Sequence, residues 1–166
     1  MKPYITTWSG HKFNFLNPEP TSITIEDIAH ALSLQCRFNG HCESFYSVAE
    51  HSVKVCNLVE GYGMERDIVL TALLHDAAEA YIGDVVSPVK QLLPEFKKIE
   101  RDLEERIAER FSLVYPFPDV VSKADKEALR LEFATLAPFC GFNPDKGLSP
   151  PEAEKLFLDA FGRLNA

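Results

Sequence analysis

The sequence predicts an all-α protein, a single helical bundle of about six or seven helices with a short irregular or hairpin segment at its N-terminus. Apolar residues recur at helical spacing along most of the chain, helix-starting motifs precede these runs, and glycine or proline follows them. The 166 residues are enough for one domain with a hydrophobic core. Because no internal repeat or linker divides the chain, we expect one domain over residues 1–166.

The N-terminal third begins without helical periodicity. Residues 1–23 contain Trp8, Gly10, Asn17, Pro18 and Pro20, a composition typical of a hairpin or irregular segment. Thr24 then opens a T-x-x-D motif, which predicts a helix continuing through Leu34. The stretch RFNGHC at residues 37–42 has a turn signal in its Asn-Gly pair and is expected to form a loop.

The middle of the chain is predicted to hold the central helices. Ser47 and Glu50 form an S-x-x-E start, and glycines at 61 and 63 end the helix that follows. Residues 65–81 are predicted to form the most apolar helix, closed by Gly83. A helix that is apolar almost all round usually lies at the centre of a bundle.

The remaining helices follow from proline positions and amphipathic stripes. A short helical turn is predicted to begin at Pro88 and to end at Pro94. Residues 95–112 carry apolar side chains on one face and charges on the other, which predicts a surface helix. Two further helices are expected over about residues 119–137 and 150–164.

The charge balance excludes some classes of partner. The formal net charge is −8, whereas a nucleic-acid-binding surface requires a basic patch. A small nucleotide needs only one or two local cations and a metal ion, so it remains a compatible ligand. Neither a signal peptide nor a membrane-length apolar run is recognisable, which predicts a cytoplasmic protein that does not act on a membrane.

Polar side chains with metal-binding groups occur where the helical pattern predicts burial. His51 faces the core side of its helix, His75 and Asp76 interrupt the most apolar helix, and Asp125 lies among small apolar residues. Glu79 lies four residues after His75 and is predicted to share a helical face with it. A single buried histidine is usually only hydrogen-bonded, and a single aspartate usually caps a helix or pairs with a cation. Because an unpaired buried carboxylate costs several kcal/mol, four such groups favour a shared metal ion.

Two imidazoles and two carboxylates suit one divalent metal ion, with Co, Mn, Ni, Fe, Zn or Mg as the candidates. Four protein ligands in a six-coordinate shell leave positions for water and for a phosphate oxygen, an arrangement that supports hydrolysis. No histidine follows His75, so the chain lacks the downstream histidines that a second ion would need. We therefore expect one metal ion per chain.

The order His51, His75–Asp76, Asp125 resembles the H…HD…D signature of the HD phosphohydrolase superfamily. The stretch HDAAEAYIGDVVSPVK, at residues 75–90, is similar to the motif of bacterial HD-domain 5'-deoxynucleotidases, and small phage dATP triphosphohydrolases are also similar. The resemblance implies a helical HD domain in which these four side chains hold the metal. It also implies a possible homodimer.

By the same resemblance, Glu79 and Asp84 are the catalytic carboxylates. One would activate water, and the other would protonate the leaving sugar oxygen or bind the sugar; the sequence leaves open which does which. The residues expected to contact the substrate are Arg37, Phe38, His41, Lys90 and Lys123. The deoxynucleotidases carry tryptophan directly after the arginine, whereas Phe38 has no N–H donor, so the resemblance does not extend to sugar selectivity.

The expected activity is hydrolysis of the phosphate ester of a (deoxy)nucleoside 5'-monophosphate. One alternative is a deoxynucleoside triphosphate triphosphohydrolase, which would release tripolyphosphate. A second alternative is a non-catalytic module that binds a nucleotide. The two enzymatic alternatives differ in how many cations line the phosphate site, which the sequence does not settle.

Overall fold

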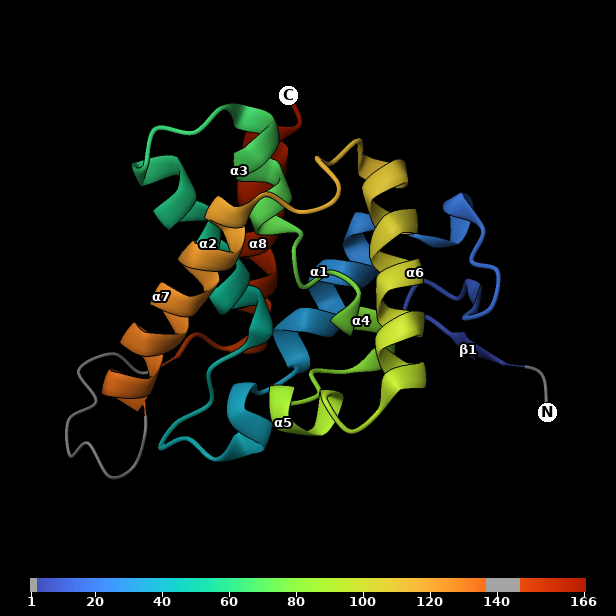
Figure 1. The fold of residues 1–166 in the computed structure, drawn as a ribbon, viewed down its shortest axis with the longest axis horizontal. Coiled ribbons are helices and arrows are strands. Elements are labelled where there is room, and N and C mark those ends of the chain that lie inside the picture. The colour runs from blue at the N-terminus through green and yellow to red at the C-terminus, as the bar shows by residue number, and fades with distance from the viewer. Residues whose placement is uncertain (1–2, 137–146) are drawn as a thin grey trace.

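The structure, a computed structural model, describes residues 3–136 and 147–166. Within these ranges it is the predicted helical bundle, with eight α-helices, two of which are single turns, and one small hairpin (Figure 1). The helices are α1 Ile25–Leu34, α2 Val48–Gly61, α3 Arg66–Leu73, α4 Glu79–Ile82, α5 Ser87–Lys90, α6 Pro94–Phe111, α7 Asp119–Leu136 and α8 Pro150–Leu164. The all-α prediction is therefore confirmed, and the separate single turn α4 accounts for the additional helix.

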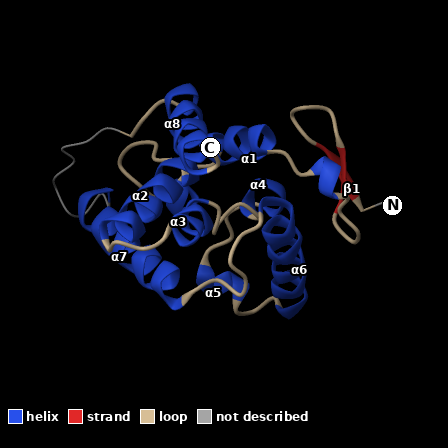
Figure 2. Cartoon of the chain, turned by 90° about the horizontal axis from the view of Figure 1, so that it is seen from above, coloured by secondary structure: helices blue, strands red, loops and turns tan. Residues whose placement is uncertain are grey.

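The N-terminal hairpin consists of the antiparallel strands β1 (Tyr4–Thr6) and β2 (Lys12–Asn14). It lies at one end of the molecule, near α6 and far from α7 (Figure 2). Ser9 attaches it to the bundle, because its backbone N–H and its hydroxyl donate to the two carboxylate oxygens of Asp27 at 2.8 and 2.7 Å. The hairpin also contributes the fully buried Phe13, whose ring stacks on that of Tyr81 in α4 with 4.1 Å between the ring centres.

Helix α2 is the centre of the bundle and packs against α1, α3, α7 and α8. Its start is a capping box in which Ser47 Oγ accepts from the Glu50 N–H at 3.1 Å and Glu50 Oε2 accepts from the Ser47 N–H at 2.9 Å. The other Glu50 oxygen, Oε1, accepts from the backbone N–H of Leu148 just before α8, at 2.8 Å. These bonds hold the first turn of α2 in place against the segment before α8, and His51 lies in this turn.

The prediction of one helix over residues 65–81 is wrong. Helix α3 ends at Leu73, residues 74–78 form turns, and α4 is a separate single turn. Leu74 leaves helical geometry at φ −102° and ψ 11°, and the backbone bonds that follow join residues three apart, such as Glu79 N–H to the Asp76 carbonyl at 2.9 Å. The His75 ring bonds to the Ala72 carbonyl at 2.8 Å, so that carbonyl is satisfied by a side chain instead of by the next helical turn.

Most of the other predicted boundaries agree with the structure, but the short helix predicted to end at Pro94 already ends at Lys90. Helix α5 begins at Ser87 beside Pro88, α6 covers the predicted amphipathic segment, and α7 follows the predicted range as far as Leu136; position 137 lies outside the described residues. Helix α8 begins and ends where the sequence predicted. Within the described part of the chain, no helix combines the length and apolar character that crossing a membrane requires.

Candidate metal centre

Four predicted ligands meet at the centre of the molecule from three different segments. His51 comes from the first turn of α2, His75 and Asp76 from the turn after α3, and Asp125 from α7. His51 Nε2 is 3.2 Å from Asp125 Oδ1 and 3.5 Å from Asp76 Oδ2, and His75 Nε2 is 3.2 Å from Asp76 Oδ2. Ligand atoms of His51, His75 and Asp125 all lie within 4.8 Å of one another, close enough to share one ion.

The two histidines are oriented as metal ligands. His51 Nδ1 bonds to Glu132 Oε1 at 2.9 Å, and His75 Nδ1 bonds to the Ala72 carbonyl oxygen at 2.8 Å. Since both partners are acceptors, each Nδ1 carries the proton and each Nε2 keeps a free lone pair. Both Nε2 atoms are buried and have no hydrogen-bond partner. Buried polar atoms rarely lack a partner, so this donor set fits a divalent cation.

The charges of the site also suit a cation. Burial disfavours the charged forms, but the imidazoles of His75 and His51 and the Arg37 guanidinium hold the pKa of the Asp76 carboxyl well below its usual range. Burial likewise opposes protonation of His75, yet the Asp76 carboxylate raises its pKa to about 8. Protons therefore compete with a metal ion for the His75 ring, and metal affinity is expected to increase as the pH rises.

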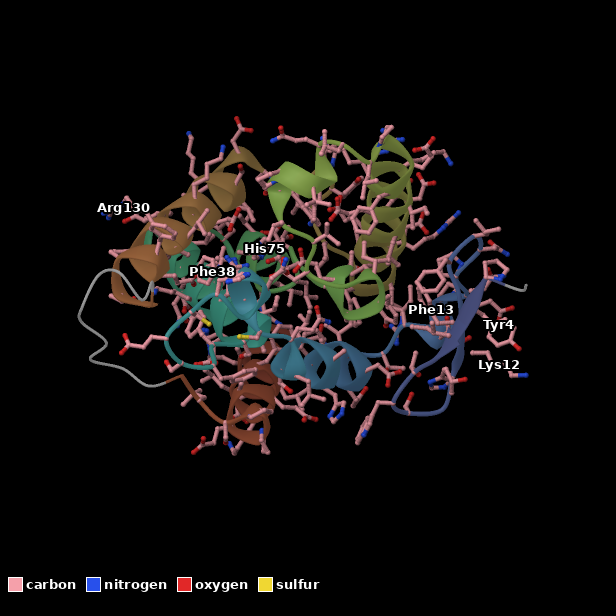
Figure 3. All side chains as sticks on the ribbon, turned by 90° about the horizontal axis from the view of Figure 1, so that it is seen from below. Tyr4, Lys12, Phe13, Phe38, His75 and Arg130 are labelled. Carbon is pink, nitrogen blue, oxygen red and sulfur yellow. The ribbon has the colours of Figure 1, made fainter. Side chains whose placement is uncertain are left out.

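A cavity of about 340 Å³ opens beside the four ligands. Phe38 and the neighbouring His75 both lie near the middle of the molecule, whereas Tyr4 and Lys12 of the hairpin lie at its far end (Figure 3). The residues lining the cavity are Arg37, Phe38, Asp76, Glu79, Asp84, Val85, Val86, Ser87, Pro88, Lys90, Asp125 and Leu129. The structure thus brings both predicted catalytic carboxylates and three predicted substrate contacts to the same cavity as two of the predicted ligands.

Arg37 is held in the cavity wall by an unusual turn. Residues 37–40 form a short 3-10 turn in which Phe38 and Asn39 have left-handed backbone angles, φ 57° and 51°. The backbone N–H of Arg37 donates to the Tyr46 carbonyl at 2.9 Å, and its guanidinium lies 5.5 Å from the centre of the Phe38 ring. The side chain is 9% exposed, and its Nε is buried without a hydrogen-bond partner. A buried guanidinium in the lining of the cavity suits an anionic ligand.

Glu79 is the first residue of α4, and Asp84 follows that helix directly after Gly83. Gln35 at the end of α1 joins their two segments, because its Nε2 donates to the Glu79 carbonyl and its Oε1 accepts from the Asp84 N–H, both at 3.0 Å. Lys90 donates to Glu79 Oε1 at 3.0 Å and to Glu100 Oε1 of α6 at 2.5 Å. Lys90 therefore lies in the cavity as predicted, but its charge is already shared between two carboxylates.

Two predicted substrate contacts lie elsewhere in the structure. His41 follows the 3-10 turn and is exposed, and Lys123 is exposed on α7. Neither side chain lines the cavity beside the metal ligands. Their contact with a substrate stays a prediction of the sequence alone.

Several residues at this site escaped the sequence analysis. Glu132 lies two helical turns after Asp125 on α7, so helical periodicity together with its charge among apolar neighbours was a usable signal. Tyr46, Gln35 and Glu100 gave no such signal, because each is an ordinary polar residue in its local pattern. Their roles depend on contacts between segments far apart in the chain.

A helical bundle that gathers a histidine, an adjacent histidine–aspartate pair and a further aspartate at one cavity has the architecture of the HD-domain superfamily. Comparison with known families gives a more specific assignment: a model of the YfbR-like 5'-deoxynucleotidases matches residues 37–132, and the chain belongs to this family. The matched segment begins at Arg37, ends at Glu132 and includes all four predicted ligands.

Two similar proteins extend beyond this segment. The Escherichia coli K12 protein YfdR is 39% identical over 132 residues, which cover 80% of this chain and 69% of YfdR. The Rhodobacter capsulatus protein RCAP_rcc00048 is 36% identical over 158 residues, covering 90% of this chain and 76% of that protein. Both carry the name uncharacterized protein.

Proposed function

We propose that this protein hydrolyses the phosphate ester of a (deoxy)nucleoside 5'-monophosphate to the nucleoside and orthophosphate. The observation that carries the proposal is one cavity lined by Arg37, Glu79, Asp84 and the carboxylates of Asp76 and Asp125, next to two unpartnered histidine nitrogens. Membership in the YfbR-like 5'-deoxynucleotidase family supports it. The proposal also holds that the substrate is a small nucleotide.

The charges in the cavity favour a monophosphate over a triphosphate. Its lining includes two basic side chains, Arg37 and Lys90, and four acidic ones. Lys90 is paired with Glu79 and Glu100 at 3.0 and 2.5 Å, whereas Arg37 lies at longer distances from its carboxylates, 3.9 Å from Asp76 and 3.4 Å from Glu132. Arg37 is therefore the more available cation of the two. One guanidinium and one divalent ion can balance a single phosphate group, whereas a triphosphate would place further negative charge beside acidic side chains.

In this proposal His51, His75, Asp76 and Asp125 hold one divalent ion. Such an ion, when bound, polarises a phosphoryl oxygen and makes water more acidic. Arg37 binds the phosphate through paired N–H donors, and it restricts the phosphate to one orientation because a guanidinium is planar. Phe38, which lines the same cavity, provides an apolar face for the sugar or the base.

We assign the two proton transfers to Glu79 and Asp84. Burial and the nearby Asp76 and Asp84 carboxylates raise the pKa of Glu79, while the Lys90 ammonium stabilises its ionised form. Ionised Glu79 is thus a stronger base than an ordinary carboxylate, and its ion pair with Lys90 favours the ionised form that accepts a proton from water. Burial also raises the pKa of Asp84, which can then carry a proton to the leaving sugar oxygen.

Product analysis tests the reaction. Purified protein supplemented with Co²⁺ or Mn²⁺ is incubated with ribo- and deoxynucleoside monophosphates and triphosphates, and the phosphate product is identified. We expect orthophosphate from monophosphates and little turnover of triphosphates, because the cavity supplies too few free cations for the longer phosphate chain. Tripolyphosphate as the main product would overturn the monophosphate assignment, and absence of turnover by metal-loaded protein would contradict a nucleotidase.

The roles of Glu79 and Asp84 can be distinguished by comparing a nucleotide with p-nitrophenyl phosphate, a substrate whose leaving group needs no proton. Glu79→Gln is expected to lower kcat about 10²–10⁴-fold for both a nucleotide and the aryl phosphate, the usual range for a lost general base. Asp84→Asn is expected to lower kcat by a similar factor for the nucleotide and much less for the aryl phosphate. The reverse pattern, with Glu79→Gln rescued by the aryl phosphate, would exchange the two roles.

A further inference from the structure

Glu132 is a charged residue of α7 that is fully buried. Its Oε1 accepts from His51 Nδ1 at 2.9 Å and from the Tyr46 hydroxyl at 3.2 Å. Its Oε2 is 3.4 Å from the Nη2 nitrogen of the Arg37 guanidinium. One carboxylate therefore contacts a predicted metal ligand with one oxygen and the predicted phosphate-binding guanidinium with the other.

These partners face the buried Glu132 carboxylate from both of its oxygens. A carboxylate removed from water is costly unless it is paired and hydrogen-bonded. Glu132 Oε1 lies within hydrogen-bond distance of His51 and Tyr46, and Oε2 faces the Arg37 guanidinium at 3.4 Å. The carboxylate is therefore placed between His51 and Arg37 and contacts both.

The contact with His51 determines the state of that ring. An ionised carboxylate can only accept, so Nδ1 must carry the proton and Nε2 must present its lone pair toward Asp76 and Asp125. The contact also restricts rotation of the ring. A carboxylate behind a ligating histidine typically improves metal affinity by these two effects.

The contact with Arg37 determines which of its donors remain available. The guanidinium nitrogen Nη2 faces Glu132, Nη1 lies 3.9 Å from Asp76 Oδ2, and Nε has no hydrogen-bond partner. Because the guanidinium is planar, a contact that holds Nη2 in place also restricts the plane in which the other donors lie. A phosphate entering the cavity then meets a guanidinium that is already oriented.

We propose that Glu132 is a positioning residue that orients His51 for the metal ion and Arg37 for the phosphate at the same time. The Arg37 half rests on the proposed function, whereas the His51 half depends only on the metal site. The two oxygens of Glu132 separate the roles, so one substitution can remove one role and largely keep the other.

Glu132→Gln is the informative variant, because glutamine has the same shape. Its carbonyl oxygen can still accept from His51 and Tyr46, but its amide group then faces the N–H donors of Arg37. We expect the Co²⁺ dissociation constant, from calorimetric titration, to rise by no more than about threefold. The dissociation constant of inorganic phosphate for the Co²⁺-loaded protein is expected to rise about tenfold or more, because a charge-assisted contact is replaced by facing donors.

Glu132→Ala removes both contacts and is expected to raise the Co²⁺ dissociation constant about 10–100-fold as well. If this variant does not fold, Glu132→Gln and Tyr46→Phe still test the proposal. Tyr46→Phe removes a hydrogen bond to Glu132 Oε1, the oxygen that faces His51. Phosphate binding should therefore stay within about threefold of wild type. Glu127→Gln is the matched control, since Glu127 is an exposed residue of α7 that bonds to Tyr62, and neither constant should change.

Wild-type constants for both Co²⁺ and phosphate in Glu132→Gln and Glu132→Ala would overturn the proposal. Equal losses of Co²⁺ binding, phosphate binding and thermal stability in the two variants would show a merely structural role and would also overturn it. The Co²⁺ titration needs no substrate. If the protein hydrolyses no nucleotide but Glu132→Ala still weakens Co²⁺ binding, the proposed function fails while the His51 half of this inference stands.

Discussion

Asp76→Asn is expected to abolish metal binding and phosphate release together. Asparagine has nearly the same shape but lacks the negative charge that faces both histidines, with Oδ2 at 3.2 Å from His75 Nε2 and 3.5 Å from His51 Nε2. We expect the Co²⁺ dissociation constant to rise more than about 100-fold, beyond the range typical of residues that only support a ligand. Calorimetric Co²⁺ titration and orthophosphate release from a nucleoside monophosphate measure the two effects.

The matched control is Asp102→Asn, an aspartate of α6 that is about half exposed and pairs with Lys98 at 3.1 Å. An exposed pair of this kind contributes little, so both readouts should match wild type. Treating wild-type protein with a chelator should reproduce the activity loss of Asp76→Asn, and added Co²⁺ should restore activity to wild type but not to the variant. An Asp76→Asn variant that binds Co²⁺ normally would contradict the ligand assignment.

Arg37→Met is expected to reduce both turnover and stability. Loss of two charge-assisted hydrogen bonds to phosphate, at about 1.5–3 kcal/mol each, predicts a kcat/KM at least about 100-fold lower. The fully buried Glu132 also loses its guanidinium partner. Breaking a buried ion pair costs on the order of 3 kcal/mol, the low end of its usual range here because His51 and Tyr46 still bond to the carboxylate. Steady-state kinetics and denaturant unfolding measure the two losses.

Arg37→Lys separates charge from shape. Lysine keeps the positive charge near Glu132 but cannot form paired donors, so stability should recover more than kcat/KM does. Lys97→Met removes an exposed cation of α6 away from the cavity and should change neither quantity. If Arg37→Met kept wild-type kcat/KM, the phosphate would have to be bound by other groups.

Much of the fold was predictable from local sequence because local interactions determine where helices begin and end. The capping box at Ser47 and Glu50, the proline at the start of α8 and the left-handed glycine at 83 all act within a few residues of their own positions. Their predicted boundaries agree with the structure. The same reasoning placed four metal-binding side chains on core-facing positions.

The break after Leu73 was not predictable from periodicity. Residues 65–81 are apolar enough for one continuous helix, and nothing in their spacing marks an interruption. The structure ends α3 where the His75 ring bonds to the Ala72 carbonyl and the backbone changes to bonds between residues three apart. This turn points His75 and Asp76 toward α2 and α7, which a continuous helix would not have done for both.

The state of Lys90 also depended on the tertiary structure. As a residue of a recognisable motif it was expected to contact phosphate, yet Glu100 and Glu79 approach it from two different helices. Its charge is therefore largely balanced before any substrate enters, which is what favours a monophosphate. No local pattern around Lys90 contains this information.

The sequence by itself determined the helical class, most helix boundaries and the set of candidate metal-binding side chains, because caps, periodicity and unusual buried polar residues are properties of short segments. The tertiary structure alone decided how those side chains are paired: Glu132 behind His51 and Arg37, Gln35 between Glu79 and Asp84, and Glu100 on Lys90. These contacts join segments separated by many residues. Their energies depend on burial and distance, which exist only once the chain is packed.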